Sequence, residues 1–201
     1  MMVLPEVVWT HPALPKILTF IPLNVRSLLD LGCGRGIIGA LCRIYRNPRR
    51  LVGVDIFDPY LEFCRKYSFY DEVIKWDLNI LPLPFKDGEF DVVTAIEVIE
   101  HLPKKSGEKL LTEMERIACK RVIVSTPNVF FQQKNYDKNE YQIHKSLWTW
   151  RDFVSRGYKT YGVGKFILLG RRIRWLSFYL ANITWKFPQF SSLILCIKDL
   201  E

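Results

Sequence analysis

The sequence lacks the cysteine and histidine patterns that form disulfide frameworks or zinc sites. Its cysteines are odd in number and scattered, with no Cys-x-x-Cys pair. Small secreted domains pair an even set, and structural zinc sites cluster their ligands. We therefore expect reduced thiols at all five positions, namely Cys33, Cys42, Cys64, Cys119 and Cys196.

The chain also lacks the long apolar runs of membrane and exported proteins. No uncharged apolar run reaches the roughly 18 residues that a spanning helix needs. The segment Met1–Glu6 has neither the basic flank nor the apolar run of a signal peptide. We therefore expect a cytoplasmic protein. With 49% hydrophobic and 25% charged residues among 201, the composition is that of a globular domain.

Positive charge is present in excess, but it is unevenly placed. Of the net charge of +8, residues 1–129 contribute +1 (17 Lys and Arg against 16 Asp and Glu). Residues 130–201 contribute +7 (12 against 5). A solvated basic face and an anionic partner both explain such a surplus. The two interpretations stay open at this point.

Apolar periodicity predicts alternating strands and helices. Strands are expected at residues 27–31, 51–54, 72–76, 90–95, 121–125, 158–163 and 193–197. Helices are expected at residues 37–45, 59–67, 107–118, 148–155 and 171–186, with Asp58 as the N-cap of the second. This alternation indicates an α/β protein with a parallel sheet and helices on both faces.

The first strand runs directly into a glycine-rich turn, Gly32-Cys33-Gly34-Arg35-Gly36. Glycine removes the Cβ where a backbone must bend sharply and lets a ligand approach. Asp30 ends the strand, and ligands of open α/β sheets bind at that end. Gly34 to Gly39 also satisfies G-x-G-x-x-G, the dinucleotide fingerprint, although the pattern alone is weak. A carboxylate beside the turn suits a cationic sulfonium cofactor better than a pyrophosphate.

Two further acids follow neighbouring strands. Asp55 ends the second strand, where a carboxylate offers two acceptor oxygens to the hydroxyls of a ribose. Asp77 follows the third strand, and Leu78 beside it offers an apolar surface for a base. A plain helix cap at Asp55 and a plain loop acid at Asp77 are the alternatives. Asp30, Asp55 and Asp77 together predict a row of acids along one edge of the sheet.

These residues resemble class I S-adenosylmethionine-dependent methyltransferases of the small-molecule, type 11-like group. The matching motifs are Asp30–Gly36, Val54–Ile56, Asp77–Leu78, Pro82–Phe85 leading to Phe90–Val93, Ile96–Leu102 and Ser125–Asn128. The resemblance implies a Rossmann-like, doubly wound fold with a seven-strand, mostly parallel sheet whose last strand is antiparallel. It implies one domain over residues 1–201, with the cofactor in 26–128 and substrate-side, lid-like segments in 129–190.

The resemblance also implies S-adenosylmethionine as the cofactor and assigns residues to it. Gly32, Gly34 and Gly36 would pass under the methionine part, and Cys33 belongs to the same cofactor-binding turn, where a small packed residue is the alternative. Asp55 and Ile56 would face the ribose, and Asp77 with Leu78 the adenine. Glu97 would lie beside the sulfonium, with Asp30 behind the turn.

Catalytic candidates are His101 and His144, the two histidines on the expected acceptor side. A general base is needed only where the acceptor must lose a proton. Glu97, Glu100 and His101 form a Glu-x-x-Glu-His run that suggests a metal, a surface pair of acids or a structural histidine. No second cluster in the sequence completes a coordination set, so we predict no metal.

The acceptor is predicted to be a small molecule, anionic or lipid-linked, recognised by residues 171–186. This segment combines Arg171, Arg172 and Arg174 with aromatic residues, a pattern that fits core packing, a lid or dimer face, or a membrane surface. Nucleic acid is not expected, because no Asn-Pro-Pro-Tyr type motif follows the fourth strand. Two alternatives remain: an NAD(P)-dependent oxidoreductase and a non-catalytic partner subunit that binds the cofactor. The oligomeric state stays open.

Overall fold

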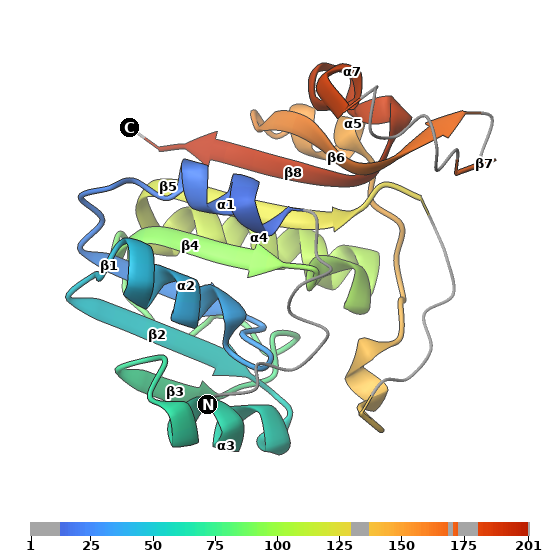
Figure 1. Cartoon of the computed structure of the whole chain (residues 1–201). Helices are drawn as coiled ribbons and strands as arrows, with labels where there is room; N and C mark the ends of the chain where they lie inside the picture. Colours follow the sequence, from blue (N-terminus) through green and yellow to red (C-terminus); the bar gives the residue numbers. More distant parts are fainter. Residues whose placement is uncertain (1–12, 130–136, 169–170, 173–180, 201) are drawn as a thin grey trace, which may run out of the picture.

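A computed structural model describes residues 13–129, 137–168, 171–172 and 181–200. Its centre is a sheet in the order β3-β2-β1-β4-β5-β8-β6-β7, flanked by helices (Figure 1). The strands are β1 (Ser27–Leu31), β2 (Arg50–Asp55), β3 (Glu72–Lys75), β4 (Phe90–Ile96), β5 (Ala118–Pro127), β6 (Lys159–Leu168), β7 (Arg171–Arg172) and β8 (Ser191–Asp199). The helices are α1 (Leu14–Phe20), α2 (Ile37–Tyr45), α3 (Asp58–Tyr67), α4 (Lys104–Ile117), α5 (Trp150–Val154) and α7 (Ala181–Lys186). Single 3-10 turns are η2 (Ile99–His101), η3 (Glu140–Gln142) and η4 (Pro188–Phe190).

The first five strands pair in parallel, as the alternation of strands and helices predicts. β8 is antiparallel to both of its neighbours, β5 and β6. The seven-strand, Rossmann-like arrangement with the last strand antiparallel is therefore confirmed. The two-residue strand β7 is an addition at the far edge, where it pairs with β6.

Two apolar layers hold the sheet between its helices. Leu28 packs with residues of α1, α2 and α3 on one face, and Leu29 packs with residues of α4 on the other. This alternation follows from the strand geometry, which points successive side chains to opposite faces. Figure 1 shows α1 and α2 in front of the sheet and α4 behind it. Because both faces are covered, ligands have access mainly at the ends of the strands.

The expected helix over 171–186 is wrong at its start. Arg171 and Arg172 form β7 and pair with Leu168 and Ile167 of β6, and the described helical part of the segment is α7, Ala181–Lys186. Strand pairing overrides the apolar spacing here. The spacing of apolar residues also predicted the wrong buried face for this helix, because Ile183 is 42% exposed while Thr184 is buried. Arg174 and the aromatic residues Trp175, Phe178 and Tyr179 of that segment lie outside the described residues, whereas Trp185 is described.

Smaller differences concern the ends of elements. Asp58 is the first residue of α3 rather than its N-cap, which is Phe57, and its carboxylate pairs with Lys75. Helix α4 begins at Lys104, three residues before the expected start. Within the described residues, no helix combines the length and hydropathy that crossing a membrane requires.

Candidate functional site

A cavity of about 740 Å³ opens at the carboxyl ends of β1, β2 and β4. It is lined by Asp30, Gly32, Cys33, Gly34, Asp55, Ile56, Asp77, Leu78, Glu97 and His101 from the predicted set. Gly36 and His144 are absent from the lining. The structure thus brings nearly all of the predicted residues to one cavity. Which ligand groups they contact remains a prediction.

The glycine turn forms the floor of this cavity. Gly34 has φ +54°, and a Cβ added there would meet nothing within 4 Å, so the backbone faces open space. Gly32 has φ +68°, and its added Cβ would lie 2.4 Å from Val98 Cγ2. Gly36 is the N-cap of α2 and packs against Phe69 rather than facing the cavity. Two of these glycines therefore shape the turn, while Gly34 presents bare backbone to a ligand.

Asp30 is buried beneath the turn and held by two hydroxyl groups. Tyr70 donates to Asp30 Oδ2 at 2.6 Å, and Thr94 donates to Oδ1 at 2.7 Å. Burial raises the pKa of Asp30 to about 6, although both hydrogen bonds lower it; the charge of Asp55 raises it further. The Tyr70 hydroxyl also accepts from the backbone N–H of Gly39 at 3.1 Å. Tyr70 therefore connects strand β1 to helix α2 behind the cavity.

Asp55 connects the second strand to the glycine turn. Its Oδ2 accepts from the backbone N–H of Gly34 at 2.9 Å, and its Oδ1 accepts from Phe57 N–H at 3.0 Å. Burial raises the pKa of this carboxyl, while the backbone hydrogen bonds lower it. A carboxylate has about four acceptor positions, so these bonds leave it able to accept from a ligand hydroxyl.

The third strand end forms the far side of the cavity. Asp77 Oδ1 accepts from the backbone N–H and the side-chain amide of Asn79, at 2.9 and 2.8 Å. Leu78 is buried and lines the cavity beside Trp76. This region offers an apolar surface with a carboxylate at its edge, and such a surface suits a planar nucleobase.

Acidic and imidazole groups gather at the opposite end, after β4. Glu97 has φ +56°, a strained value for a residue with a side chain, at a cost of about 1 kcal/mol. Ser125 holds it there: its carbonyl accepts from Glu97 N–H at 3.0 Å, and its hydroxyl donates to Glu97 Oε1 at 2.8 Å. Fixed in this way, Glu97 lines the cavity.

Glu100 and His101 lie next to Glu97 on η2. Glu100 is 2% exposed, and burial together with the charge of Glu97 raises the pKa of its carboxyl well above the ordinary value. Burial lowers the pKa of His101 to about 4, so its imidazole is neutral at pH 7. A general base works best with a pKa near the working pH, and His101 is therefore a weak base. His144 lies against it, with ring centroids 5.0 Å apart.

A segment from residue 137 to 145 crosses the open side of the cavity. Asp137 accepts from the Tyr60 hydroxyl at 2.8 Å and pairs with Arg35 of the glycine turn at 2.8 Å. Gln142 donates to the same Tyr60 hydroxyl at 2.8 Å. Asp137, Asn139, Tyr141, Gln142 and Lys145 of this segment line the cavity. The cavity is thus closed in part by residues remote from its floor.

Sequence reasoning missed the residues that support the site from a distance. Tyr70 and Thr94 carry no motif, and only the fold brings them to Asp30. Tyr60 lies on α3, five residues after Asp55, and lines the cavity. The sequence also gave no sign that His144 lies beside Glu100 and His101.

Comparisons with known proteins identify what this chain is similar to. Residues 29–124 match the family model described as a methyltransferase domain. Norajmaline N-methyltransferase from Rauvolfia serpentina is 33% identical over 99 residues, which cover 47% of this chain and 32% of that protein. A ubiquinone biosynthesis O-methyltransferase from Acinetobacter baylyi is 24% identical over 120 residues, covering 58% and 47%. The match therefore spans less than half the length of either curated relative.

A solved structure extends the comparison beyond the matched segment. An S-adenosylmethionine-dependent methyltransferase from Archaeoglobus fulgidus superimposes with a TM-score of 0.66 at 19% identity, covering 92% of this chain and 90% of that one. At this identity the similarity shows the fold. The fold is that of the Rossmann-like methyltransferases, including the part of this chain beyond residue 124.

Proposed function

Because residues 29–124 match the model of the methyltransferase-domain family, we propose that this protein transfers a methyl group from S-adenosylmethionine to a small-molecule acceptor. S-adenosylmethionine is the cofactor that the family implies. The observation that carries the proposal is the cavity at the carboxyl ends of β1, β2 and β4, with the glycine turn as its floor and an acid at each neighbouring strand end. Its volume of about 740 Å³ lies in the range of small-molecule sites.

In this proposal the cofactor lies along the row of strand ends. Gly32, Cys33 and Gly34 pass beneath the methionine part, where the bare backbone at Gly34 allows close approach. Asp55 accepts from the ribose hydroxyls, since its carboxylate has acceptor positions left. Leu78 packs on the adenine, and Asp77 accepts from its amino group. Glu97 places a negative charge near the positive sulfonium and amino groups.

Methyl transfer needs alignment more than activation, because the sulfonium is already a reactive donor. A lone pair of the acceptor forms a bond to the methyl carbon, and the carbon–sulfur bond breaks with its electron pair moving to sulfur. S-adenosylhomocysteine leaves as a neutral thioether. Holding the acceptor in line with that bond is the largest contribution. The segment 137–145 excludes water from the open side. His101 and His144 are the acceptor-side candidates in this scheme.

Calorimetry with S-adenosylhomocysteine and with NAD tests the cofactor assignment. We expect S-adenosylhomocysteine to bind and NAD to show no heat. Asp55→Asn should weaken binding about 10-fold or more, because a ribose hydrogen bond to a charged acceptor contributes about 1.5–3 kcal/mol. Asp58→Asn, at an exposed pair with Lys75, is the matched control and should bind as the wild type does. Tight binding of NAD alone would refute the proposal.

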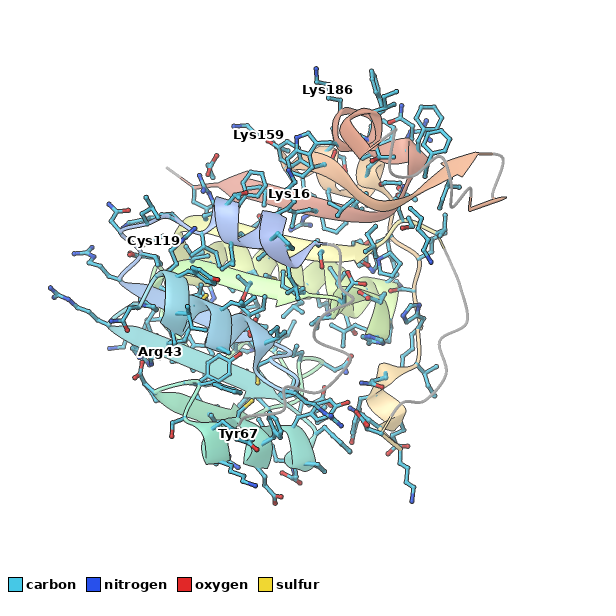
Figure 2. All side chains as sticks on the ribbon, in the orientation of Figure 1. Lys16, Arg43, Tyr67, Cys119, Lys159 and Lys186 are labelled. Atoms are coloured by element: carbon cyan, nitrogen blue, oxygen red, sulfur yellow. The ribbon has the colours of Figure 1, made fainter. Side chains whose placement is uncertain are left out.

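The finer part of the proposal concerns the acceptor, which we infer to be anionic or lipid-linked. The surplus of basic residues after residue 129 supports it, as does Lys145 in the cavity lining. Figure 2 shows two exposed cations of that region, Lys159 and Lys186, on the side of the molecule where β6 and α7 lie. Trp185 favours packing over a membrane contact, because its ring stacks on Tyr161 at 4.4 Å.

Tritiated methyl transfer into a host-cell extract tests the acceptor class. The extract is separated into lipid, small-molecule, RNA and protein pools after incubation with the purified protein. We expect label in the small-molecule or lipid pool, and less of it with Lys145→Glu or with Arg171, Arg172 and Arg174 all changed to Glu. Label confined to RNA or protein would refute this part, and unchanged transfer by both variants would refute the role of the basic residues.

A further inference from the structure

Three potential metal ligands meet at the acceptor end of the cavity, from two segments far apart in the sequence. Glu100 and His101 belong to the turn after β4, and His144 comes from the segment that crosses the cavity. One ligand atom from each lies within 4.8 Å of the others. The Nε2 of His101 is 4.0 Å from Oε1 of Glu100. The spacing of the sequence alone does not reveal this cluster.

One carboxylate oxygen of Glu100 lacks a hydrogen-bond partner among the described residues. Its Oε2 accepts from the Thr126 hydroxyl at 3.0 Å, but Oε1 is buried and has no hydrogen-bond partner among the described residues. Leaving a buried acceptor unsatisfied costs about 1–3 kcal/mol, and more for a charged group. Oε1 is the atom that faces His101. A cation between the carboxylate and the two imidazoles would satisfy it.

The imidazole of His101 is oriented as metal-binding histidines usually are. Its Nδ1 lies 3.3 Å from the carbonyl oxygen of Ile143, so the ring N–H at Nδ1 donates to that oxygen. The lone pair is then on Nε2, which faces Glu100. Metal-bound histidines almost always donate the other ring nitrogen to a carbonyl or carboxylate, which fixes the tautomer. Here the fixed tautomer leaves the correct nitrogen free to bind a cation.

The backbone holds the two segments together independently of any ion. The N–H groups of Lys145 and Ser146 both donate to the carbonyl oxygen of Glu100, at 2.8 and 3.1 Å. His144 is the residue before this pair, and it is 9% exposed. The position of His144 beside Glu100 is therefore a property of the fold rather than a chance approach of side chains.

The spacing suits a first-row divalent cation. Ligands at 2.0–2.2 Å from a tetrahedral ion stand about 3.4 Å apart, so a pair at the 4.8 Å limit of this cluster needs to approach by about 1.4 Å. Two imidazoles and a carboxylate favour Zn²⁺, Fe²⁺ or Mn²⁺ over Mg²⁺ and Ca²⁺, which prefer oxygen ligands alone. Glu97, which also lines the cavity, adds a second acid beside the cluster.

We propose that Glu100, His101 and His144 bind a divalent cation at the acceptor end of the cavity, with its open positions directed at the acceptor. The acceptor group is then a hydroxyl. Its oxygen binds the cation, which lowers the hydroxyl pKa; the proton passes to solvent. The oxygen lone pair attacks the methyl carbon, and sulfur takes the electron pair of the broken bond. The cation site stands on the cluster alone, whereas this role rests on the proposed function.

Metal binding is measured first, without any acceptor. The untagged protein is treated with a chelator, dialysed, and titrated with Mn²⁺ and Zn²⁺ by calorimetry, with Mn²⁺ also followed by electron paramagnetic resonance. We expect one cation per chain. Glu100→Gln, which keeps an acceptor for Thr126, and His144→Asn should each weaken binding by about 100-fold or more. Glu108→Gln, an exposed acid on α4, is the control and should bind as the wild type does.

The outcomes separate the site from the activity. Thermal unfolding and S-adenosylhomocysteine binding, measured on the same variants, show whether each is folded. Absence of Mn²⁺ and Zn²⁺ binding by the wild type, or equal binding by the folded variants, would overturn the metal site. If S-adenosylhomocysteine fails to bind while the cation binds, the proposed function fails and the site stands.

The position of the cation relative to the methyl donor is tested by magnetic resonance. S-adenosylmethionine labelled with ¹³C at its methyl group is bound to the protein loaded with Mn²⁺ or with diamagnetic Zn²⁺. We expect Mn²⁺ to broaden the methyl signal strongly in the wild type and in Glu108→Gln, but not in His144→Asn. A methyl signal that Mn²⁺ leaves sharp in the wild type would overturn the role in methyl transfer.

Discussion

The two ends of the cavity are built in different ways. At the cofactor end, the residues stand at the ends of consecutive strands, and the floor is five residues of continuous chain. At the acceptor end, the three potential metal ligands come from the turn after β4 and from a segment some forty residues later. The first end depends on local backbone geometry and the second on long-range packing. Substitutions should therefore act through different mechanisms at the two ends.

The largest effect is expected from Gly32→Ala at the cofactor end. The new Cβ would lie 2.4 Å from Val98 Cγ2 at φ +68°, so the turn must move. We expect affinity for S-adenosylhomocysteine to fall about 100-fold or more by calorimetry, since a shift of about 1 Å in a positioned site has that order of effect. Gly88→Ala is the control, with φ +63° but only a 3.6 Å contact to Cys119. It should lose stability and retain affinity; an equal loss of affinity would show that strain alone is responsible.

The pH dependence of stability should reveal the buried Asp30. Its pKa is about 6 in the folded protein against 3.8 in the unfolded chain. Between these values the folded state still holds a proton that the unfolded state has released, so stability falls as pH rises. Relative to Asp30→Asn, the wild type should lose up to about 3 kcal/mol between pH 4 and pH 7. Urea unfolding measures the free energy of unfolding of both proteins at each pH. A difference between them that does not change with pH would contradict the prediction.

Tyr70→Phe should destabilise the fold behind the cofactor end. It removes the hydroxyl that donates to Asp30 and accepts from Gly39, which leaves two buried polar groups short of a partner. A cost of about 1–3 kcal/mol is expected in urea unfolding. Tyr67→Phe, on the same side of the sheet and labelled in Figure 2, should change stability by less than about 0.5 kcal/mol. Similar losses in both variants would argue against the hydrogen bonds.

The smallest effect is expected where the two ends are joined by Asp137. Asp137→Asn weakens the pair with Arg35, whose side chains are 35% and 38% exposed. Exposed ion pairs contribute about 1 kcal/mol or less, so affinity for S-adenosylhomocysteine should fall less than about 5-fold. This loss of affinity should also become smaller at high salt, which screens exposed charges. A loss that persists at high salt would show that the segment acts through the Tyr60 hydrogen bond instead.

The same contrast explains which features could be read from the sequence. The glycine turn, Asp55 and Asp77 were predictable because each sits at the end of a periodic apolar strand, and parallel strands bring those ends together. Tyr70 and Thr94 were not predictable, nor was the position of His144 beside Glu100 and His101, because these contacts depend on where distant segments pack. The error at Arg171 and Arg172 has the same origin: their pairing with β6 outweighs the local spacing of apolar residues.

The order of the strands has a consequence for synthesis. β6 joins the main sheet through β8, which leaves the ribosome after it and lies between it and β5. Domains generally begin to fold from the N-terminal side during translation. The cofactor end can therefore assemble early, while β6 waits about twenty residues for the strand that joins it to the sheet. During that interval the edge of β6 that later pairs with β8 is exposed to other chains, so slowing translation before Ser191 should increase aggregation of the nascent protein.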